Sequence, residues 1–158
     1  MRINHTVSAK LLLRLVEDQQ KIESLVAWFF YSRKDPYAVR ITFHDGLYEP
    51  VEWYVARDLL STGIEGHAGL GDVTVWPSAG ADAPGGMLNI KLSSPTGRAH
   101  MQAAVNDISD FLRRTYQIVS AGEESEHVNA EAELTHLLRH AALSRAGSSP
   151  LRTHAAPG

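Results

Sequence analysis

The segment from Asp35 to Leu60 gathers several side chains whose types and spacing could do chemistry. It reads DPYAVRITFHDGLYEPVEWYVARDLL and contains His44, Glu49 and Glu52. Two carboxylic acids near a histidine are residue types that general acid–base catalysis uses. Whether they form an active site depends on which side of the chain each of them faces.

Alternation along this segment favours a structural interpretation of the acids. Glu52 lies between Val51 and Trp53, so in a β-strand it faces away from both. Arg40 lies on the polar face of the preceding predicted strand, where it can stand opposite Glu52. A cross-strand ion pair of about 0.2–1 kcal/mol accounts for these charges without any catalysis.

Two histidines near the end of the chain have the spacing of a zinc helix. His136 and His140 are four residues apart, so on a helix they share one face. In the HExxH zinc motif the residue after the first histidine is a glutamate, and here it is Leu137. Since no third ligand is obvious, we predict two solvent-facing histidines and no metal site.

The other catalytic and cofactor motifs are absent from the sequence. GIEGHAGLG, residues 63–71, lacks the Gly-Lys-Ser/Thr ending of a phosphate-binding loop and follows a predicted helix instead of a strand. The nucleophile-elbow pattern G-x-S-x-G does not occur. There are no cysteines, which excludes disulfides, thiolate nucleophiles and thiolate metal sites. We therefore predict no catalytic residue, no metal and no cofactor.

Aromatic and basic residues follow one another between Trp28 and Lys34, in the sequence WFFYSRK. Platforms that stack the bases of single-stranded nucleic acids have this composition. The same rings are needed to pack a strand that is apolar on both faces. The formal net charge is −3, which gives no electrostatic case for nucleic acid. Core packing is the favoured interpretation, and nucleic-acid binding is the alternative.

About six segments have the alternation or the short apolar run that is typical of β-strands. EDQQKIES, residues 17–24, is polar and predicts a connection. LVAWFFYS, residues 25–32, indicates a strand that is central or covered on both faces. Asp45–Gly46 begins a hairpin loop that ends near Pro50. The predicted strands are residues 5–16, 25–32, 37–44, 51–55, 72–77 and 87–93.

Two helices are predicted before residue 120. A short one at Arg57–Thr62 is expected to end at Gly63 in the C′ position. Ser94 and Pro95 have the chemistry of a helix start, a capping hydroxyl followed by proline. From there we predict an amphipathic helix of about twenty residues. Its apolar face would contain Met101, Ala104, Val105, Ile108, Phe111, Leu112 and Thr115.

The length of the chain suits one domain with a tail. A chain of 158 residues buries about 68–70% of its extended surface on folding, which is enough for a core. Asn129 can cap a further, C-terminal helix, and the composition from about Leu143 is typical of a disordered tail. We predict a single α+β domain over residues 1–142 and a tail over 143–158. Without a signal peptide or an apolar stretch of the ~20 residues that span a membrane, a cytoplasmic protein is expected.

Several segments resemble the SsgA-like family of actinomycete sporulation and cell division proteins. They are DPYAVRITFH, VEWYVARDLL, GDVTVWPS, LSSPTGRA, FLRRT and EAELTHLL, which occur in the family's order. Together they span roughly residues 7–142. The sequence departs from the family pattern after Ala142, at Tyr54–Val55 and at Arg33–Lys34, which leaves open which member it is.

This resemblance implies a fold and a function. The fold would be β-rich antiparallel sheets related to the single-strand-binding Whirly proteins, assembled as a homotrimer. The function would be non-enzymatic: protein–protein interaction in septum-site selection and in the control of cell-wall synthesis or remodelling during sporulation-specific division. The implied partners are divisome proteins, such as the tubulin-like FtsZ or another SsgA-like protein, with recruitment from the cytoplasm to the division septum. The fold analogy keeps single-stranded nucleic-acid binding as the alternative function.

Three residues are candidates for a partner interface. Trp76 is out of register with Val73 and Val75, so it faces the other side of its strand. Aromatic anchors dominate interface energies, although a helix covering that face would also account for Trp76. Arg57 and Asp58 open the short helix, where a role within the fold is favoured over contact with a partner.

Overall fold

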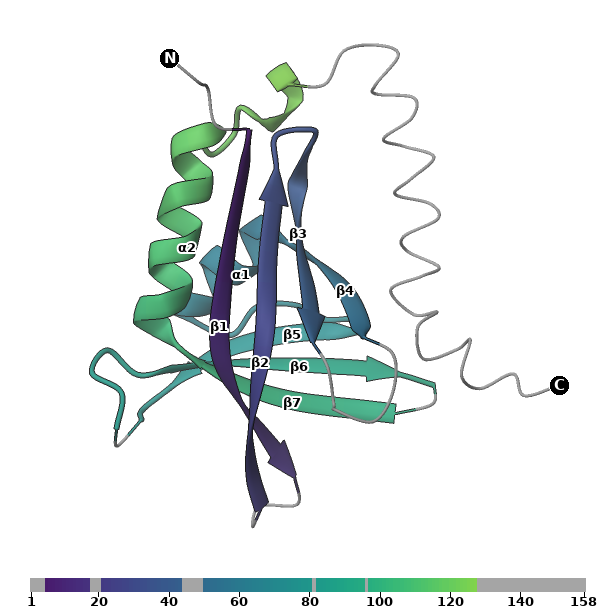
Figure 1. The fold of residues 1–158 in the computed structure, drawn as a ribbon, viewed down its shortest axis with the longest axis vertical. Coiled ribbons are helices and arrows are strands. Elements are labelled where there is room, and N and C mark those ends of the chain that lie inside the picture. Colours follow the sequence, from purple (N-terminus) through teal and green to yellow (C-terminus); the bar gives the residue numbers. More distant parts are fainter. Residues whose placement is uncertain (1–4, 18–20, 44–49, 81, 96, 128–158) are drawn as a thin grey trace, which may run out of the picture.

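Seven strands form one antiparallel sheet in a computed structural model that describes residues 5–17, 21–43, 50–80, 82–95 and 97–127. Their order across the sheet is β4-β3-β2-β1-β7-β6-β5. Figure 1 shows β1–β4 running along the long axis of the molecule and β5–β7 lying across it. This arrangement confirms the predicted α+β class. The strands are β1 (Thr6–Glu17), β2 (Lys21–Ser32), β3 (Asp35–Phe43), β4 (Val51–Ala56), β5 (Val73–Ser78), β6 (Met87–Ser94) and β7 (Gly97–Ala104).

Three helical segments accompany the sheet. They are α1 (Arg57–Glu65), α2 (Val105–Ile118) and the short 3-10 helix η1 (Glu124–His127). The predicted C-terminal helix from Asn129, with His136 and His140, and the predicted tail lie outside the described residues. The division of the chain into a domain and a tail therefore stays a prediction.

The first two strands are longer than the sequence pattern indicates. β1 and β2 pair over their full length, from Thr6 opposite Ser32 to Glu17 opposite Lys21. The prediction of a polar connection over residues 17–24 was therefore wrong for Glu17 and for residues 21–24. β1 pairs with β7 only through Arg14 and Leu15, so much of the hairpin has no partner strand on the β1 side. The backbone groups there are satisfied by the hairpin's own ladder.

The hairpin predicted from the opening segment is confirmed. β3 and β4 are antiparallel, and Ile41 stands opposite Trp53. Arg40 is paired with Tyr54, whereas Glu52 is paired with Thr42, so Arg40 and Glu52 are diagonal neighbours instead of a direct pair. Diagonal residues on one face of a sheet are still within reach of long side chains.

The helix predicted to start at Ser94 was wrong in its first half. β6 continues to Ser94, which pairs with Gly97 at the start of β7, so the Ser94–Pro95 step opens a β-hairpin. Met101 and Ala103 are both buried and alternate with half-buried neighbours, as a strand requires. β7 is needed between β1 and β6 to make the sheet continuous. The helix proper begins at Val105 and has 14 residues.

Gly63 lies inside α1 and does not end it. The helix continues to Glu65, and Gly66 follows in an extended conformation. Gly63 is buried against Val75 of β5, where a Cβ atom would overlap the valine side chain. The glycine therefore allows α1 to pack closely on the sheet. Local sequence rules had instead predicted that it ends the helix.

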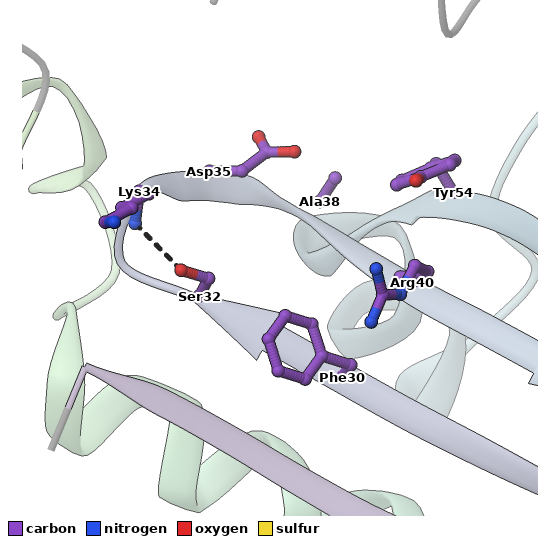
Figure 2. Close-up of a pocket in the computed structure, with 7 residues that line it drawn as sticks. All are labelled: Phe30, Ser32, Lys34, Asp35, Ala38, Arg40 and Tyr54. Atoms are coloured by element: carbon purple, nitrogen blue, oxygen red, sulfur yellow. Dashed lines mark hydrogen bonds between the residues drawn. The ribbon is translucent and has the colours of Figure 1, made fainter. Parts of the chain in front are cut away.

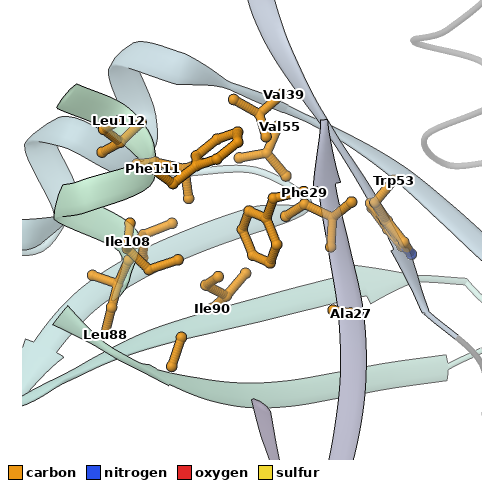
Figure 3. Packing of buried hydrophobic residues seen from close by; sticks show 14 of the residues in the cluster. Ala27, Phe29, Val39, Trp53, Val55, Leu88, Ile90, Ile108, Phe111 and Leu112 are labelled. Carbon is orange, nitrogen blue, oxygen red and sulfur yellow. The ribbon is translucent and has the colours of Figure 1, made fainter. Parts of the chain in front are cut away.

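The hydrophobic core lies between the curled sheet and the helices. Figure 3 shows Ile108 and Phe111 of α2 packed toward Phe29 of β2 and Ile90 of β6. The rings of Phe29 and Phe111 meet edge to face with centroids 5.7 Å apart. Such aromatic pairs contribute about 0.5–1.5 kcal/mol beyond the burial of their area. Strands from both ends of the sheet thus share one core with α2.

The close approach of α1 to β5 gives a stability prediction. Gly63→Ala should lower the free energy of unfolding by about 1–2 kcal/mol, because overpacking against Val75 outweighs the higher helix propensity of alanine. Urea denaturation measures this difference. The control is Gly66→Ala, whose Cβ would meet nothing within 4 Å. Equal stability of the two variants would contradict the packing role of Gly63.

Candidate interaction surface

Three apolar side chains on the outer face of the β1–β2 hairpin are open to solvent. Leu12 stands opposite Val26, and Trp28 is the next outward residue along β2. Their exposed fractions are 62%, 41% and 47%. Contiguous exposed apolar residues mark interaction sites, whereas single ones need no explanation. We call Leu12, Val26 and Trp28 the outer stripe.

The alternation of β2 explains why the outer stripe exists. Ala27, Phe29 and Tyr31 point inward and are fully buried, so the residues between them must point outward. β2 is central in the sheet, as its apolar run predicts, but among the described residues only its inner face is covered. Lys10 lies opposite Trp28, with its Nζ 5.8 Å from the centre of a Trp28 ring.

A pocket of about 320 Å³ continues this outer face toward the turn between β2 and β3. Figure 2 shows its lining side chains, which come from three neighbouring strands and the turn. The guanidinium carbon of Arg40 lies 4.5 Å from the centre of the Phe30 ring, a cation–π contact. The lining residues are Phe30, Ser32, Lys34, Asp35, Ala38, Arg40 and Tyr54.

The phenol of Tyr54 is neutral at physiological pH. Burial raises its pKa, and its hydrogen bond to Glu52 raises it further, while Arg40 acts in the opposite direction. Glu52 is therefore a hydrogen-bond acceptor for Tyr54. The other members of the acid–base hypothesis, His44 and Glu49, lie outside the described residues.

Trp76 lies on the outward side of the other end of the sheet. Val75 beside it is fully buried, in agreement with the predicted orientation. The Trp76 ring is half-buried between two histidine rings, with centroid distances of 6.1 Å to His67 and 5.2 Å to His100. Burial, and then the charge of Lys91, lower the pKa of His100, so this ring is neutral at pH 7.

The polar groups around Trp76 converge on one buried side chain. The amide of Asn89 donates to the Trp76 carbonyl and to Ser78 Oγ. Its Oδ1 accepts from Gln102 and lies 2.8 Å from Nε2 of His100. This network fixes Trp76 and His100 in position on β5 and β7. Trp76 thus has partners within the chain, and its role at a partner interface stays a proposal.

Arg57 is an interior residue, so it does not offer a surface for a partner. Its side chain is 1% exposed. It donates to the carbonyls of Thr115 and Val119 at the end of α2 and forms a 2.8 Å ion pair with Glu124. The guanidinium carbon also lies 4.1 Å from the centre of the Tyr116 ring. These contacts correct its candidacy as an interface residue, because every one of them holds the fold together.

Asp58, beside Arg57, is exposed in the first turn of α1. A carboxylate at this position interacts favourably with the helix dipole. A structural role explains Asp58 no less well than a contact with a partner does.

The residues that the fold brings together on the open outer face are Leu12, Trp28 and Arg40. Leu12, an apolar residue between Lys10 and Arg14 on the otherwise polar side of the β1 alternation, was the sequence signal for this face.

The described residues were compared with the requirements of a metal cluster and of a membrane-spanning helix. No group of three or more His, Asp or Glu side chains among them could hold a metal ion. None of their helices is long and apolar enough to cross a membrane. The open face and its pocket are thus the features that call for a function.

Comparison with known proteins identifies relatives along most of the chain. A family model described as "Streptomyces sporulation and cell division protein, SsgA" matches residues 25–124. The chain is 45% identical over 129 residues to the sporulation-specific cell division protein SsgB of Thermobifida fusca, covering 82% of this chain and 92% of that protein. It is 43% identical over 136 residues to SsgB of Streptomyces coelicolor, covering 86% and 98%.

Solved structures have the same fold. The crystal structure of an SsgA-like sporulation-specific cell division protein from Thermobifida fusca aligns with a TM-score of 0.75 at 42% identity, over 85% of this chain and 97% of that chain. A structure from a study of SsgB mutations in Streptomyces coelicolor aligns with a TM-score of 0.74 at 43% identity, over 80% and 98%.

The ion pair of Arg57 with Glu124 makes stability depend on pH. Burial alone would raise the pKa of Glu124, but the hydrogen bond from Arg57 and backbone hydrogen bonds outweigh it, so its pKa is lowered. Its stabilisation is therefore complete above the unfolded-state pKa and is lost as the pH falls through the lower folded-state value. Glu124→Gln should cost about 1–3 kcal/mol at pH 7 and progressively less in acid.

Urea denaturation between pH 7 and pH 3 measures this dependence. The matched control is Glu126→Gln, an exposed position in the same 3-10 helix, which should leave stability within about 0.5 kcal/mol of the parent. A Glu124→Gln cost that stays constant across this pH range would exclude the ion pair as its cause.

Proposed function

Because the chain belongs to the SsgA family of sporulation and cell division proteins, we propose that it acts in sporulation-specific cell division by binding other proteins. The observation that carries this proposal is the similarity to proteins named as sporulation-specific cell division proteins over more than 80% of both chains. The function is non-enzymatic recognition. It serves the choice of septum site and the control of cell-wall synthesis or remodelling.

The outer stripe is the surface on which this recognition depends. Leu12, Val26 and Trp28 stand on paired strands, whose backbones are fixed before any partner arrives. A rigid apolar surface loses little conformational entropy on binding. The tryptophan supplies the kind of anchor that carries most of the energy in interfaces. Lys10 beside it adds a cation that can choose among partners by charge.

The partners that fit the family are cytoplasmic division proteins assembling at the septum. FtsZ and another SsgA-like protein are the leading candidates. The chain would be recruited from the cytoplasm to the septum and act there as a scaffold. A second surface, around Trp76 on β5–β7, could serve a different partner, because it lies at the other end of the sheet from β2 and β3.

Replacing Leu12 of the outer stripe should abolish localisation at the septum without unfolding the protein. A fluorescent fusion is expected at sporulation septa, and Leu12→Ser should make it diffuse because the apolar contact is lost. Fluorescence microscopy of sporulating cells measures this. The control is Leu70→Ser, since Leu70 is a fully exposed leucine in the loop after α1.

The Leu70→Ser control separates the loss of the outer stripe from a general effect of replacing any exposed leucine by serine. Both leucines are exposed, so neither substitution should lower the unfolding free energy by more than about 0.5 kcal/mol. Diffuse fluorescence of the parent fusion throughout septation would contradict the proposed function. Normal localisation of Leu12→Ser would contradict the role of the outer stripe alone.

We also expect a homotrimer, as the family resemblance implies. Multi-angle light scattering of the purified protein at micromolar concentration should give three times the mass of one chain. Measuring Leu12→Ser in the same experiment tells whether the outer stripe joins subunits or faces division partners, because only the first role makes the mass fall. A monomer mass for the parent protein would contradict the trimer.

A further inference from the structure

The pocket at the β2–β3 turn contains a cation whose position is fixed before any ligand binds. Arg40 lies over the Phe30 ring, and its pairing partner across the sheet is Tyr54. A guanidinium stacked on an aromatic ring loses little rotamer freedom when an anion arrives. Figure 2 shows Arg40 and Phe30 side by side, with Lys34 at the turn beyond them.

The donors of this pocket are incompletely used within the chain. Nε of Arg40 is shielded from solvent and has no hydrogen-bond partner among the described residues. Buried donors are nearly always paired, and the exceptions call for a functional explanation. Lys34 contributes a second cation, because among the described residues only its backbone N–H is held, by Ser32 Oγ. A negatively charged acceptor would satisfy the guanidinium of Arg40, and a second one would satisfy Lys34 at the turn.

The walls and size of the pocket limit the class of ligand. Phe30, Ala38 and the ring of Tyr54 offer apolar contacts beside the two cations. A volume of about 320 Å³ is at the lower end of small-molecule sites, so it suits one or two amino-acid side chains. A carboxylate next to an apolar side chain meets both parts of the lining.

We propose that this pocket binds an acidic peptide segment of a division partner, with one carboxylate at Arg40, an aromatic or aliphatic side chain against Phe30, and a further acidic residue facing Lys34 at the turn. The proposal rests on the proposed function, in which the chain recognises other proteins. It specifies the chemical class of the partner segment. It also adds a second contact site, which lies beside the outer stripe on the same face of the sheet.

A nucleic-acid strand fits this pocket less well than a peptide does. Asp35 lines the pocket, and Glu52 accepts a hydrogen bond from Tyr54, which also lines it. These two carboxylates leave room for one anionic group but repel a run of phosphates. Binders of single strands line an extended groove with positive charge, whereas this pocket has two cations, Lys34 and Arg40.

Fluorescence anisotropy with the full chain tests the proposal. The probes are fluorescein-labelled short peptides made of aspartate and glutamate with one phenylalanine, tyrosine or leucine. Their counterparts carry asparagine and glutamine at the acidic positions, and an oligothymidine matches the net charge. The acidic peptides should bind saturably, with an affinity that falls as salt rises, and the amide counterparts should not.

Two substitutions should weaken binding, and one of matched charge should not. Arg40→Gln is expected to weaken the acidic peptides by about tenfold or more, because it removes a charge-assisted hydrogen bond. Lys34→Gln should also weaken them, and because its side chain is exposed in a turn it cannot do so by unfolding the chain. The control is Arg98→Gln on β7, which removes the same charge from an exposed position on a strand that β1 and β2 separate from β3.

Several outcomes would overturn the proposal. They are no saturable binding by any acidic peptide, equal binding of the amide counterparts, or parent-like binding by both Arg40→Gln and Lys34→Gln. Tighter binding of the oligothymidine that is lost in Arg40→Gln would assign the pocket to nucleic acid instead. If acidic peptides fail to bind while the parent fusion still reaches the septum, the pocket proposal falls and the proposed function stands.

Discussion

A buried arginine organises the inner side of this molecule. Arg57 opens α1, and its guanidinium binds the carbonyls that end α2, the carboxylate of Glu124 in η1 and the ring faces of Tyr31 and Tyr116. A cation can remain in the interior because each of these groups compensates part of its lost hydration. One side chain thereby ties the first helix, the second helix and the end of the described chain to β2.

The two helices cover one face of the sheet, which explains why the other face is open. Because α1 and α2 pack on the concave face of a single curled sheet, the alternate residues of β1, β2 and β3 face away from them. On β1 and β2 these outward residues include the outer stripe, and on β2, β3 and β4 they line the pocket with Arg40. A rigid sheet that carries apolar and cationic side chains on one face is suited to recognition. That property agrees with a family of cell division proteins.

Sequence reasoning succeeded where one local signal determined one element and failed where two signals conflicted. The alternation on both sides of Asp45–Gly46 predicted the β3–β4 hairpin, and the 3.6-residue spacing from Ile108 to Thr115 predicted the buried face of α2. Ser94–Pro95 carried a helix-start signal, yet a place between β1 and β6 required a strand after it. Gly63 carried a helix-end signal, yet the close approach of Val75 required a glycine inside the helix.

By itself the sequence determined the strand alternation, the lack of catalytic motifs and the family resemblance, since each of these depends on residue types and short spacings along the chain. Only the tertiary structure decided that Arg57 is interior, that Leu12 and Trp28 share an open face, and that Arg40, Phe30 and Tyr54 line one pocket. Those facts depend on which distant segments meet: Arg57 and Glu124 are 67 residues apart in the chain and 2.8 Å apart in the fold. No local pattern records such a distance, because the pairing of strands and the docking of helices create it.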